Sequence, residues 1–489
     1  MEHTTKQLCS FYFVALDDTT FKCKVCGTKR TKAKSAGYSN LTSHLDKKHP
    51  DYLAQFEASR ALLVGTLHQH GFVDAKATNL HAWVQWIVER NQPFSEVENP
   101  LTRNMSRLTP ICVKTLKAAM DKVTRNVEAK IAAELPDVFG LCIDGWTDGS
   151  KHFCAIFATY AVDNVRHTPL LAMSPLLKPD SMDADAHIAF IEETLGLYGK
   201  ELSNLAFVTG DNCSTNVSMA AKMGVPLVGC YSHKFNLAMK AFLLPYESDL
   251  LSIHAIMKRL GRLRPAGELT RFTDLLPICR NVTRWSSTFQ MVQRYLALLP
   301  FLPEVSGVRD LLLLSGQNTR VKKLFFVLEQ FESVTKQLQA EDLDMADART
   351  MFHGLHCRHP TLPYLAFNAE IHHYPNFDNG VAKVLSLRED ELTTAEKAAL
   401  VMFLLDPDSV AVPSTPLSYA DERLAPKRRR MGPTASKYCC LKFVLPTSNL
   451  VERLFSVAQY ILTDNRKHLY PVNFEMIIVP SREYIVLEC

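Results

Sequence analysis

Four residues near the start of the chain have the types and the spacing of a zinc site. Cys23 and Cys26 form a C-x2-C pair, and His44 and His49 form an H-x4-H pair after an interval of seventeen residues. Zinc takes four such ligands in a tetrahedron. Gly27 permits the tight turn that a C-x2-C pair requires, and the H-x4-H spacing places two imidazoles one turn apart on a helix. Two buried cysteines and two surface histidines are the alternative, but the order and spacing of the four residues favour zinc.

Acidic residues form a second set that could perform chemistry. Asp144 ends the apolar segment VFGLCID, and Asp211 follows the apolar segment LAFVTG, and both segments are expected to be strands. Functional carboxylates gather at the carboxyl ends of strands in α/β sheets, and two aspartates on neighbouring strands can share Mg²⁺ ions. Two such ions can activate a nucleophile and stabilise the leaving oxygen at phosphorus.

Glu452 is the candidate for a third carboxylate. The segment SNLVERLFSVAQYIL predicts a helix with Glu452 on a polar side and an apolar side formed by Leu450, Leu454, Val457 and Ile461. Each acidic residue also has an ordinary explanation, because an aspartate at a strand end can cap a turn and a glutamate on a polar helix face can be solvated. The residues by themselves leave both interpretations open.

The elements that must position these residues follow from the pattern of apolar residues. Residues 53–135 are expected to be helical. Five short apolar runs between residues 138 and 232 predict strands, with helices between the later ones, and this alternation indicates a mixed α/β sheet. Residues 246–440 are expected to be mostly helical. Within them, residues 385–437 are rich in Pro, Ser and charge, which predicts an exposed linker.

Length and composition predict a large intracellular protein of more than one domain. The chain has 489 residues, of which 47% are hydrophobic, enough for several packed cores. The N-terminus lacks the apolar region of a secretory signal, and no run of about 18 apolar residues occurs, so no membrane partner is expected. The 13 cysteines are then interpreted as buried residues or metal ligands rather than disulfides. The net charge of +4 is small, so a basic surface would have to be local.

The segment with the zinc ligands resembles a BED-type zinc finger over residues 1–52. Such fingers carry an aromatic stretch ahead of the first cysteine, and Phe11, Tyr12 and Phe13 are its counterpart. The resemblance implies structural Zn²⁺ and binding to double-stranded DNA. Residues 22–34 contain six Lys or Arg and no acid. Those that would neutralise phosphates include Lys22, Lys24, Lys29 and Arg30. The alternative is a merely solvated surface.

Segments along most of the chain resemble, in order, the hAT superfamily of cut-and-paste DNA transposases. They include the segments around all three acidic residues. Several motifs in one order are far more specific than any single motif. The segments are QPFSEVENP (92–100), CIDGWTDG (142–149), VTGDNCSTN (208–216), CYSHKFNL (230–237), NVTRWSSTF (281–289), LPTSNLVERLFS (445–456) and NRKHLYP (465–471).

The resemblance implies a multidomain fold and a reaction. Asp144, Asp211 and Glu452 would bind two catalytic Mg²⁺ ions, and a water or a 3′-OH would attack phosphodiesters at the ends of a mobile element. Flanking DNA would close as a hairpin, and the freed end would be joined to target DNA. The parts implied are a small ββα-like zinc finger (1–52), a helical N-terminal region (53–135), an α/β RNase H-like catalytic core (136–245), an all-helical insertion that interrupts it (246–440), and a C-terminal hAT dimerisation block that completes the core (441–489).

Four more residues receive roles from the resemblance. Cys230 and His233, the family's C-x2-H, would arrange the core or contact DNA near the scissile phosphate, because two ligands alone do not make a metal site. Arg284 and Trp285 are the family's Arg-Trp pair. Trp285 would stack on an unpaired base beside the hairpin, and its alternative is a tryptophan in the core.

Two departures from the family pattern keep a second hypothesis open. The insertion is short for the family, and the ending PSREYIVLEC lacks the aromatic residues expected there. The leading hypothesis is a nuclear, homo-oligomeric hAT-type transposase. The alternative is a catalytically inactive zinc-finger DNA-binding regulatory protein derived from one. A third hypothesis, an unrelated zinc protein with an accidental acidic triad, is disfavoured by the ordered motifs.

Overall fold

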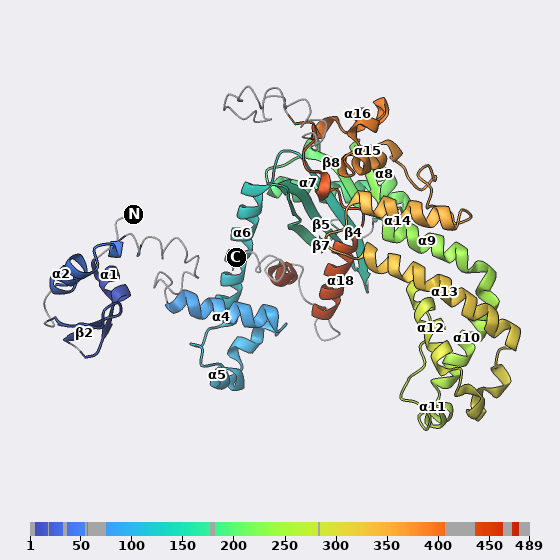
Figure 1. Ribbon diagram of the computed structural model, residues 1–489, viewed down its shortest axis with the longest axis horizontal. Helices are drawn as coiled ribbons and strands as arrows, with labels where there is room; N and C mark the ends of the chain where they lie inside the picture. The colour runs from blue at the N-terminus through green and yellow to red at the C-terminus, as the bar shows by residue number, and fades with distance from the viewer. Residues whose placement is uncertain are drawn as a thin grey trace, which may run out of the picture. The chain divides into compact units, whose positions relative to one another are not determined.

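The computed structural model describes residues 5–17, 19–32, 37–53, 56, 75–149, 151–176, 181–281, 284–405, 436–462 and 472–478. The chain divides into two compact units (Figure 1). Apart from the last residues, the first comprises residues 1–85 and 100–110, and the second comprises residues 86–99 and 111–487. In the described part of the chain, no helix has the length and apolar character needed to span a bilayer.

The N-terminal segment folds around its own small core. Helix α1 (Thr5–Tyr12) leads into strands β1 (Phe13–Ala15), β2 (Thr20–Cys23) and β3 (Lys29–Thr31), and helix α2 (Ser39–Lys48) follows. The strands form an antiparallel sheet in the order β1-β2-β3. The expected ββα outline was therefore incomplete, because α1 and β1 precede it. They belong to the fold because Tyr12 and Phe13 pack in one core with Leu41 and Leu45 of α2.

The expected helical region is confirmed where the structure describes it, and residues 57–74 lie outside the described residues. It contains α4 (Ala75–Glu89), the 3₁₀ helix η2 (Phe94–Glu98), α5 (Pro100–Ser106) and α6 (Val113–Glu134). Within the first unit, the Trp83 indole donates to the carbonyl oxygen of Thr109 at 2.9 Å. In the second unit, α6 buries Leu116, Met120 and Ile131 along one side, as the helical spacing of its apolar residues requires.

The predicted mixed α/β sheet is present in the second unit. Its strands are β4 (Phe139–Asp148), β5 (Lys151–Val162), β6 (Val165–His167), β7 (Leu170–Pro175), β8 (Leu205–Gly210) and β9 (Leu227–Gly229). Their order is β6-β5-β4-β8-β9, and β7 also pairs with β5. β4 is antiparallel to β5 and parallel to β8, which is parallel to β9. The connections contain α7 (Ala184–Leu197), η3 (Leu202–Asn204) and α8 (Ser214–Met223).

Strand β4 differs from the prediction at its end. Asp144 was expected to end the strand, but it pairs with Ala155 of β5, and the ladder continues to Asp148. The strand is longer because β4 and β5 form a hairpin whose pairing extends to its turn at Gly149, where φ is +58°. Asp144 therefore lies inside a strand, where its backbone is fixed by pairing on the β5 side.

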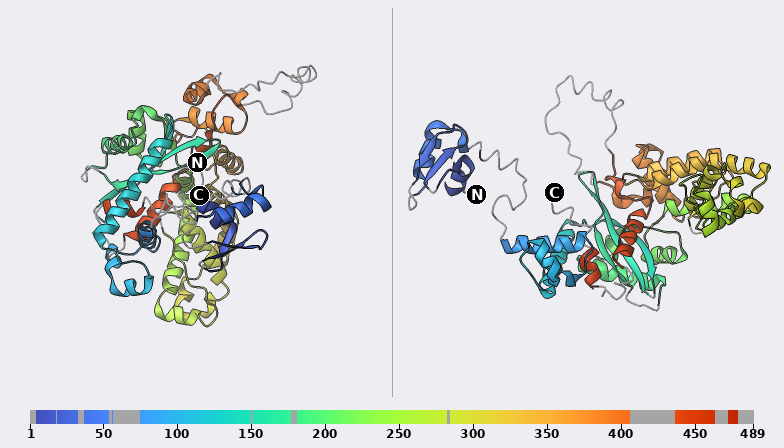
Figure 2. Two further views of the ribbon diagram at one scale, coloured as in Figure 1. Left: turned by 90° about the vertical axis from the view of Figure 1, so that its left-hand side faces the viewer. Right: turned by 90° about the horizontal axis from the view of Figure 1, so that it is seen from below.

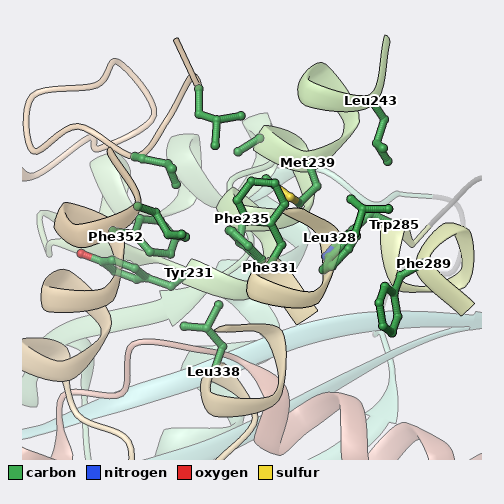
Figure 3. Close-up of a cluster of buried hydrophobic side chains, with 14 of the residues drawn as sticks. Tyr231, Phe235, Met239, Leu243, Trp285, Phe289, Leu328, Phe331, Leu338 and Phe352 are labelled. Carbon is green, nitrogen blue, oxygen red and sulfur yellow. The ribbon is translucent and has the colours of Figure 1, made fainter. Parts of the chain in front are cut away.

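A helical segment separates β9 from the C-terminal part of the second unit. Many of its apolar side chains meet in a single core, part of which is drawn in Figure 3. This confirms the predicted helical character of residues 246–440 where they are described. The elements are α9 (Tyr231–Leu243), η4 (Leu244–Tyr246), α10 (Glu247–Leu260), α11 (Leu263–Leu269), α12 (Trp285–Leu298), η5 (Leu302–Glu304), η6 (Ser306–Leu311), α13 (Ser315–Leu338), α14 (Met345–Arg358) and α15 (Pro375–Leu385).

The predicted exposed linker is wrong for its first part. Residues after α15 form η7 (Glu389–Glu391), α16 (Thr394–Ala399) and η8 (Val401–Phe403). Thr393 and Glu396 form a capping box at the start of α16, and Leu392, Leu400 and Phe403 belong to the helical core. The prediction of a linker depended on the polar composition of the segment. It failed because the few apolar residues of the segment pack into the core and hold it in place. Residues 406–435, the rest of that linker, lie outside the described residues.

The C-terminal part brings a helix back to the sheet. It contains η10 (Leu441–Phe443), α18 (Asn449–Ile461) and a helical segment at 472–478. α18 packs beside β4, as Figures 1 and 2 show. Its predicted apolar stripe was partly wrong, because Val457 is 44% exposed and the buried residues are Val451, Leu454, Phe455, Ala458 and Ile461. The motif at 465–471 and the ending 480–489 lie outside the described residues.

Candidate functional site

The four predicted zinc ligands lie together in the N-terminal segment. One ligand atom from each of Cys23, Cys26, His44 and His49 lies within 4.8 Å of all the others. The Cys26 Sγ is 3.2 Å from His44 Nε2, and the Cys23 Sγ is 3.6 Å from His49 Nε2. Two thiols and two imidazoles converging on one point are the donor set of a structural zinc site, so the residues fit Zn²⁺ and the predicted ligand set is confirmed as a metal-binding arrangement.

Local structure explains how these ligands converge. Cys23 is the last residue of β2, and the following turn closes through a hydrogen bond from the Gly27 amide to the Cys23 carbonyl at 2.9 Å. Gly27 has a φ of +73°, a conformation that glycine adopts without strain. His44 lies on α2, but His49 lies just after its end and does not share a helix face with His44 as predicted. The backbone leaves the helical conformation at His49, where φ is −141° and ψ is 63°, and its ring meets Cys23.

The electrostatics of this cluster favour metal binding. Hydrogen bonds with Thr28, followed by one with His49, lower the pKa of the Cys26 thiol to about 5. A thiol with such a pKa is a thiolate at neutral pH, and the thiolate is the form that binds a metal.

The predicted DNA-contacting residues of this segment differ in accessibility. Lys22 and Lys29 are exposed and lie opposite each other on β2 and β3. Lys24 is exposed, and its amine donates to the Ser10 carbonyl at 3.3 Å. Arg30 is half-buried, with its guanidinium 3.3 Å from His44 Nδ1. Lys22 and Lys29 are therefore presented to solvent as a pair, whereas Arg30 packs against a zinc ligand.

A cavity of about 360 Å³ brings together most of the other predicted site residues. All three acidic residues line it, together with the predicted C-x2-H pair and Arg284. Its lining comprises Asp144, Gly145, Trp146, Asp211, Cys230, His233, Arg284, Ser448, Glu452, Phe455, Ser456 and Gln459.

The two aspartates are neighbours because of the sheet register. β4 and β8 are parallel, and Cys142 of β4 is paired with Thr209 of β8. Asp144 and Asp211 each follow two residues later, so Asp211, just past the end of β8, lies next to Asp144, which is still paired with β5. Asp211 comes directly after the end of β8, where its carboxylate accepts a hydrogen bond from the Asn216 amide at 2.5 Å.

Glu452 is positioned by the residues that hold the start of α18. The Tyr231 amide donates to the Pro446 carbonyl at 2.9 Å, and the Thr209 hydroxyl donates to the Leu445 carbonyl at 3.0 Å. Asn449 donates to the Leu338 carbonyl at 2.8 Å and to the Ser232 hydroxyl at 3.1 Å. These contacts attach the first turn of α18 to the sheet and to the helical segment. Glu452, in that first turn, thereby lines the same cavity as the aspartates.

Asp144 carries the strongest electrostatic perturbation in the cavity. The pKa of its carboxyl is raised to about 7, chiefly by burial and to a smaller extent by the negative charges of Asp211 and Glu452, although a hydrogen bond from the Gly145 amide and the charge of Arg284 lower it. Carboxylate oxygens are the ligands that Mg²⁺ prefers, so these side chains have the donor type of a hard divalent cation.

The three carboxylates are less tightly gathered than the zinc ligands. Among the described residues, Cys23, Cys26, His44 and His49 are the one group of three or more Cys, His, Asp or Glu side chains that meets at a common point. In the acidic cavity, the carboxylate of Glu452 instead pairs with Arg284, with 2.5 Å between Oε2 and Nη2. A cation from the chain itself thus accompanies one of the three acidic groups.

The remaining predicted residues take different positions. Cys230 is buried, and its sulfur accepts a hydrogen bond from the Ser448 amide at 3.4 Å, which links β9 to the start of α18. His233 is exposed at the cavity. Trp285 is 4% exposed and packs edge-on to Phe235 with ring centroids 6.0 Å apart, so the structure places it in the helical core (Figure 3).

Sequence reasoning missed several residues that organise the site. Asn216 and Asn449 hold Asp211 and the start of α18, and Trp146 stacks on Phe455 of α18 with centroids 5.9 Å apart. Their signals were weak. Asn216 and Asn449 lie five residues after and three residues before a predicted acidic residue, and Trp146 follows Asp144 by two. The hydrogen bonds of Asn216 and Asn449 and the packing of Trp146 on α18 give these positions their roles in organising the site.

Comparisons with known proteins support one part of this description. Residues 8–50 match the BED zinc finger family. The N-terminal segment is therefore a BED zinc finger, which confirms that part of the resemblance. No curated protein matches the chain. A solved structure, the Drosophila P element transposase strand transfer complex, is similar with a TM-score of 0.30 and 9% identity, over 88% of this chain and 98% of that chain. A TM-score this low carries no conclusion about function.

Proposed function

We propose that the protein is a DNA transposase of the hAT type, in which the BED finger binds double-stranded DNA and Asp144, Asp211 and Glu452 perform metal-dependent phosphodiester cleavage and strand transfer. The observation that carries this proposal is the convergence of the three carboxylates on one cavity, although they come from β4, the end of β8 and α18. An accidental triad would not be expected to share a cavity with the C-x2-H pair and Arg284.

The topology supports an RNase H-like catalytic core. The first three long strands, β4, β5 and β7, are joined by antiparallel pairings, and β8 and β9 then add parallel to β4. The helical segment that starts at α9 interrupts this core before α18 returns to β4. This arrangement matches the outline that the hAT resemblance implies, with the last carboxylate supplied by the returning helix.

The chain's own residues suggest a division of labour in the cavity. Asp144, Asp211 and Glu452 would hold Mg²⁺, which when bound would activate the attacking oxygen and stabilise the leaving oxygen at phosphorus. Arg284 is 72% exposed, so its guanidinium can reach a phosphate while it also pairs with Glu452. His233 is exposed beside them. Cys230 is buried and attaches α18, which makes it a positioning residue rather than a metal ligand.

The test is cleavage and strand transfer on DNA that carries the terminal inverted repeats of the element encoding this protein. We expect Mg²⁺-dependent products from the wild type and none from Asp144→Asn or Glu452→Gln. Asp148→Asn is the matched control, because Asp148 lies on the same strand but does not line the cavity. Equal activity of the wild type and Asp144→Asn would refute the catalytic role of the triad.

A catalytically inactive DNA-binding regulator is the second candidate. The Arg284–Glu452 ion pair favours it, because this cation compensates a carboxylate that a catalytic metal would otherwise use. In this case no protein would cleave DNA, whereas the zinc-loaded wild type would still bind duplex DNA through its finger. The cleavage assay with a parallel binding measurement separates the two functions.

Residues 441–489 are also proposed to mediate a homo-oligomer. Val457 and Tyr460 of α18 are 44% and 71% exposed and would supply apolar contacts to a second copy. Light scattering of the full chain should give a mass above one chain, and Val457→Ser with Tyr460→Ser should reduce it toward the monomer. A monomeric wild type would contradict this proposal. The nucleus is the location expected for this function, and imaging of a fluorescent fusion would test it.

A further inference from the structure

The turn between α10 and α11 concentrates positive charge on the surface of the second unit. Residues 258–273 contain five basic residues and one acidic residue, so this short segment alone has a net charge of +4, equal to that of the whole chain. Within it, Lys258, Arg262 and Arg264 fall within seven residues and are exposed. We call residues 258–264 the basic turn.

The cations of the basic turn are available to a ligand. Among the described residues, no carboxylate forms an ion pair with Lys258, Arg262 or Arg264. The acidic residue of the segment, Glu268, is directed elsewhere, because both its carboxylate oxygens accept hydrogen bonds from Ser306, at 2.7 and 2.8 Å from the hydroxyl. Arg259 is half-buried and donates to the Gly307 carbonyl at 3.4 Å. Within the part of the chain that the structure describes, these three cations therefore have no ion-pair partner.

The backbone beneath these cations is held firmly. Pro265 is buried against Gly307 so closely that a Cβ at Gly307 would lie 2.6 Å from the proline ring. The hydrogen bonds of Arg259 to Gly307 and of Glu268 to Ser306 attach both sides of the turn to η6. A rigid support reduces the entropy lost when a surface binds a ligand. The apex residue Leu263 is 91% exposed, so an apolar side chain also projects between Arg262 and Arg264.

We propose that the basic turn is a second binding surface for duplex DNA, separate from the BED finger. Backbone phosphates attract Lys and Arg side chains, of which the basic turn presents three exposed ones within seven residues, and apolar side chains accompany such cations at DNA grooves. The proposal rests on the proposed function in one respect. The DNA molecule held by the basic turn is the one that would enter the acidic cavity. Figures 1 and 2 show α10 and α11 at the end of the helical segment away from the sheet. The basic turn would therefore contact DNA that flanks the reacting phosphate.

The salt dependence of DNA binding tests this inference. Binding of a long duplex to the full chain is measured without added Mg²⁺, so that no cleavage occurs, for the wild type and for Lys258→Gln/Arg262→Gln/Arg264→Gln. Each lost phosphate contact lowers the slope of log affinity against log salt by about 0.9, so the triple variant should lose about 2.7 from the slope. When salt rises from 50 to 200 mM, the factor by which DNA affinity falls should therefore be about 40 times smaller for the triple variant than for the wild type.

A matched variant and a second probe keep the test specific. Lys322→Gln/Lys323→Gln/Lys336→Gln removes three exposed cations from α13 of the same unit and should keep the wild-type slope. An unchanged slope in the basic-turn variant would overturn the inference, and so would an equal loss in the control. Loss of binding to anionic lipid vesicles with an unchanged DNA slope would assign the turn to a membrane instead. Failure of the proposed catalysis would appear separately, as absent cleavage with the slope difference intact.

Discussion

The guanidinium of Arg284 and the carboxylate of Glu452, which are 168 positions apart in sequence, form an ion pair across the acidic cavity, with Nη2 and Oε2 2.5 Å apart. Arg284 precedes α12 directly, and Glu452 lies in the first turn of α18. The pair joins the helical segment to the helix that completes the site. It also places a fixed positive charge where a metal ion would require negative charge.

Removal of this cation should strengthen metal binding. We expect Arg284→Ala to lower the Mg²⁺ concentration that gives half-maximal thermal stabilisation of the DNA-free protein. Because Arg284 is 72% exposed, the pair is worth at most about 1 kcal/mol, and the change should reach at most about fivefold. Arg453→Ala is the control, since Arg453 also lies on α18 but pairs with Glu341 outside the cavity. An unchanged Mg²⁺ response in Arg284→Ala would show that the pair does not compete with the metal.

Loss of zinc should unfold the BED finger without affecting the second unit. The finger has a small core, so the metal contributes a large share of its folding free energy. Cys26→Ser should reduce bound zinc from one ion per chain to none and abolish DNA binding by the finger, while the main thermal transition stays in place. Zinc content, measured by mass spectrometry, and calorimetry check this. Cys112→Ser, which changes an exposed cysteine of the second unit, should keep the zinc.

Asn449 should act as a positioning residue for Glu452. Asn449→Ala leaves the buried Leu338 carbonyl without its donor, which costs about 1–3 kcal/mol of stability. It also releases the first turn of α18, so we expect a several-fold increase in the Mg²⁺ requirement of cleavage. Arg453→Ala alters a position of the same helix outside the cavity and should leave that requirement unchanged. A stability loss with a normal Mg²⁺ requirement would leave Asn449 a purely structural role.

A buried ionic cluster should stabilise the helical segment beside the site. The amine of Lys234, which follows His233 on α9, lies 3.0 Å from His372 Nδ1 and 3.9 Å from the Asp378 carboxylate, and all three side chains are buried. Burial lowers the pKa of Lys234 to about 8, which leaves it charged at neutral pH.

Lys234→Met removes one of the cations beside the buried Asp378 carboxylate, so it should destabilise the protein by about 3–5 kcal/mol. Lys234→Met/Asp378→Asn should recover part of this loss, because the Asp378 charge is removed together with its partner, while the buried Arg349 beside His372 keeps its charge. Thermal denaturation of the single and double variants measures the coupling, and strictly additive losses would contradict it.

Glu475 should make stability fall as pH rises. Burial, together with the charge of Glu128, raises the pKa of its carboxyl from 4.5 to about 7. Between these values the unfolded chain has lost its proton while the folded protein retains it, so stability declines with pH and the cost is complete above pH 7. Glu475→Gln should therefore stabilise the protein at pH 8 by about 3 kcal/mol and have little effect at pH 4. Denaturation at both pH values measures this, with Glu134→Gln on α6 as an exposed control. Equal effects of Glu475→Gln at pH 4 and pH 8 would rule out the titration of this carboxyl.

The features that could be predicted from the sequence alone are those that depend on residues close together in the chain. The zinc ligands were predictable because a turn and a helix set the separations of Cys23, Cys26 and His44 within one short segment. The strands of the sheet were predictable from short apolar runs, since hydrophobic periodicity is local. The same reasoning failed at Val457 and at residues 389–403, where composition suggested a buried residue and an exposed linker, respectively.

Which distant residues share a site follows from the packing of the whole fold. The parallel register of β4 and β8 places Asp144 beside Asp211, and hydrogen bonds at the start of α18 add Glu452. Packing of α9, α12 and α13 also decided that Trp285 is buried while its neighbour Arg284 reaches the cavity. Such outcomes depend on contacts between elements far apart in the chain. The helical spacing of apolar residues predicts which of them share a face. The element that packs against that face depends on the tertiary structure.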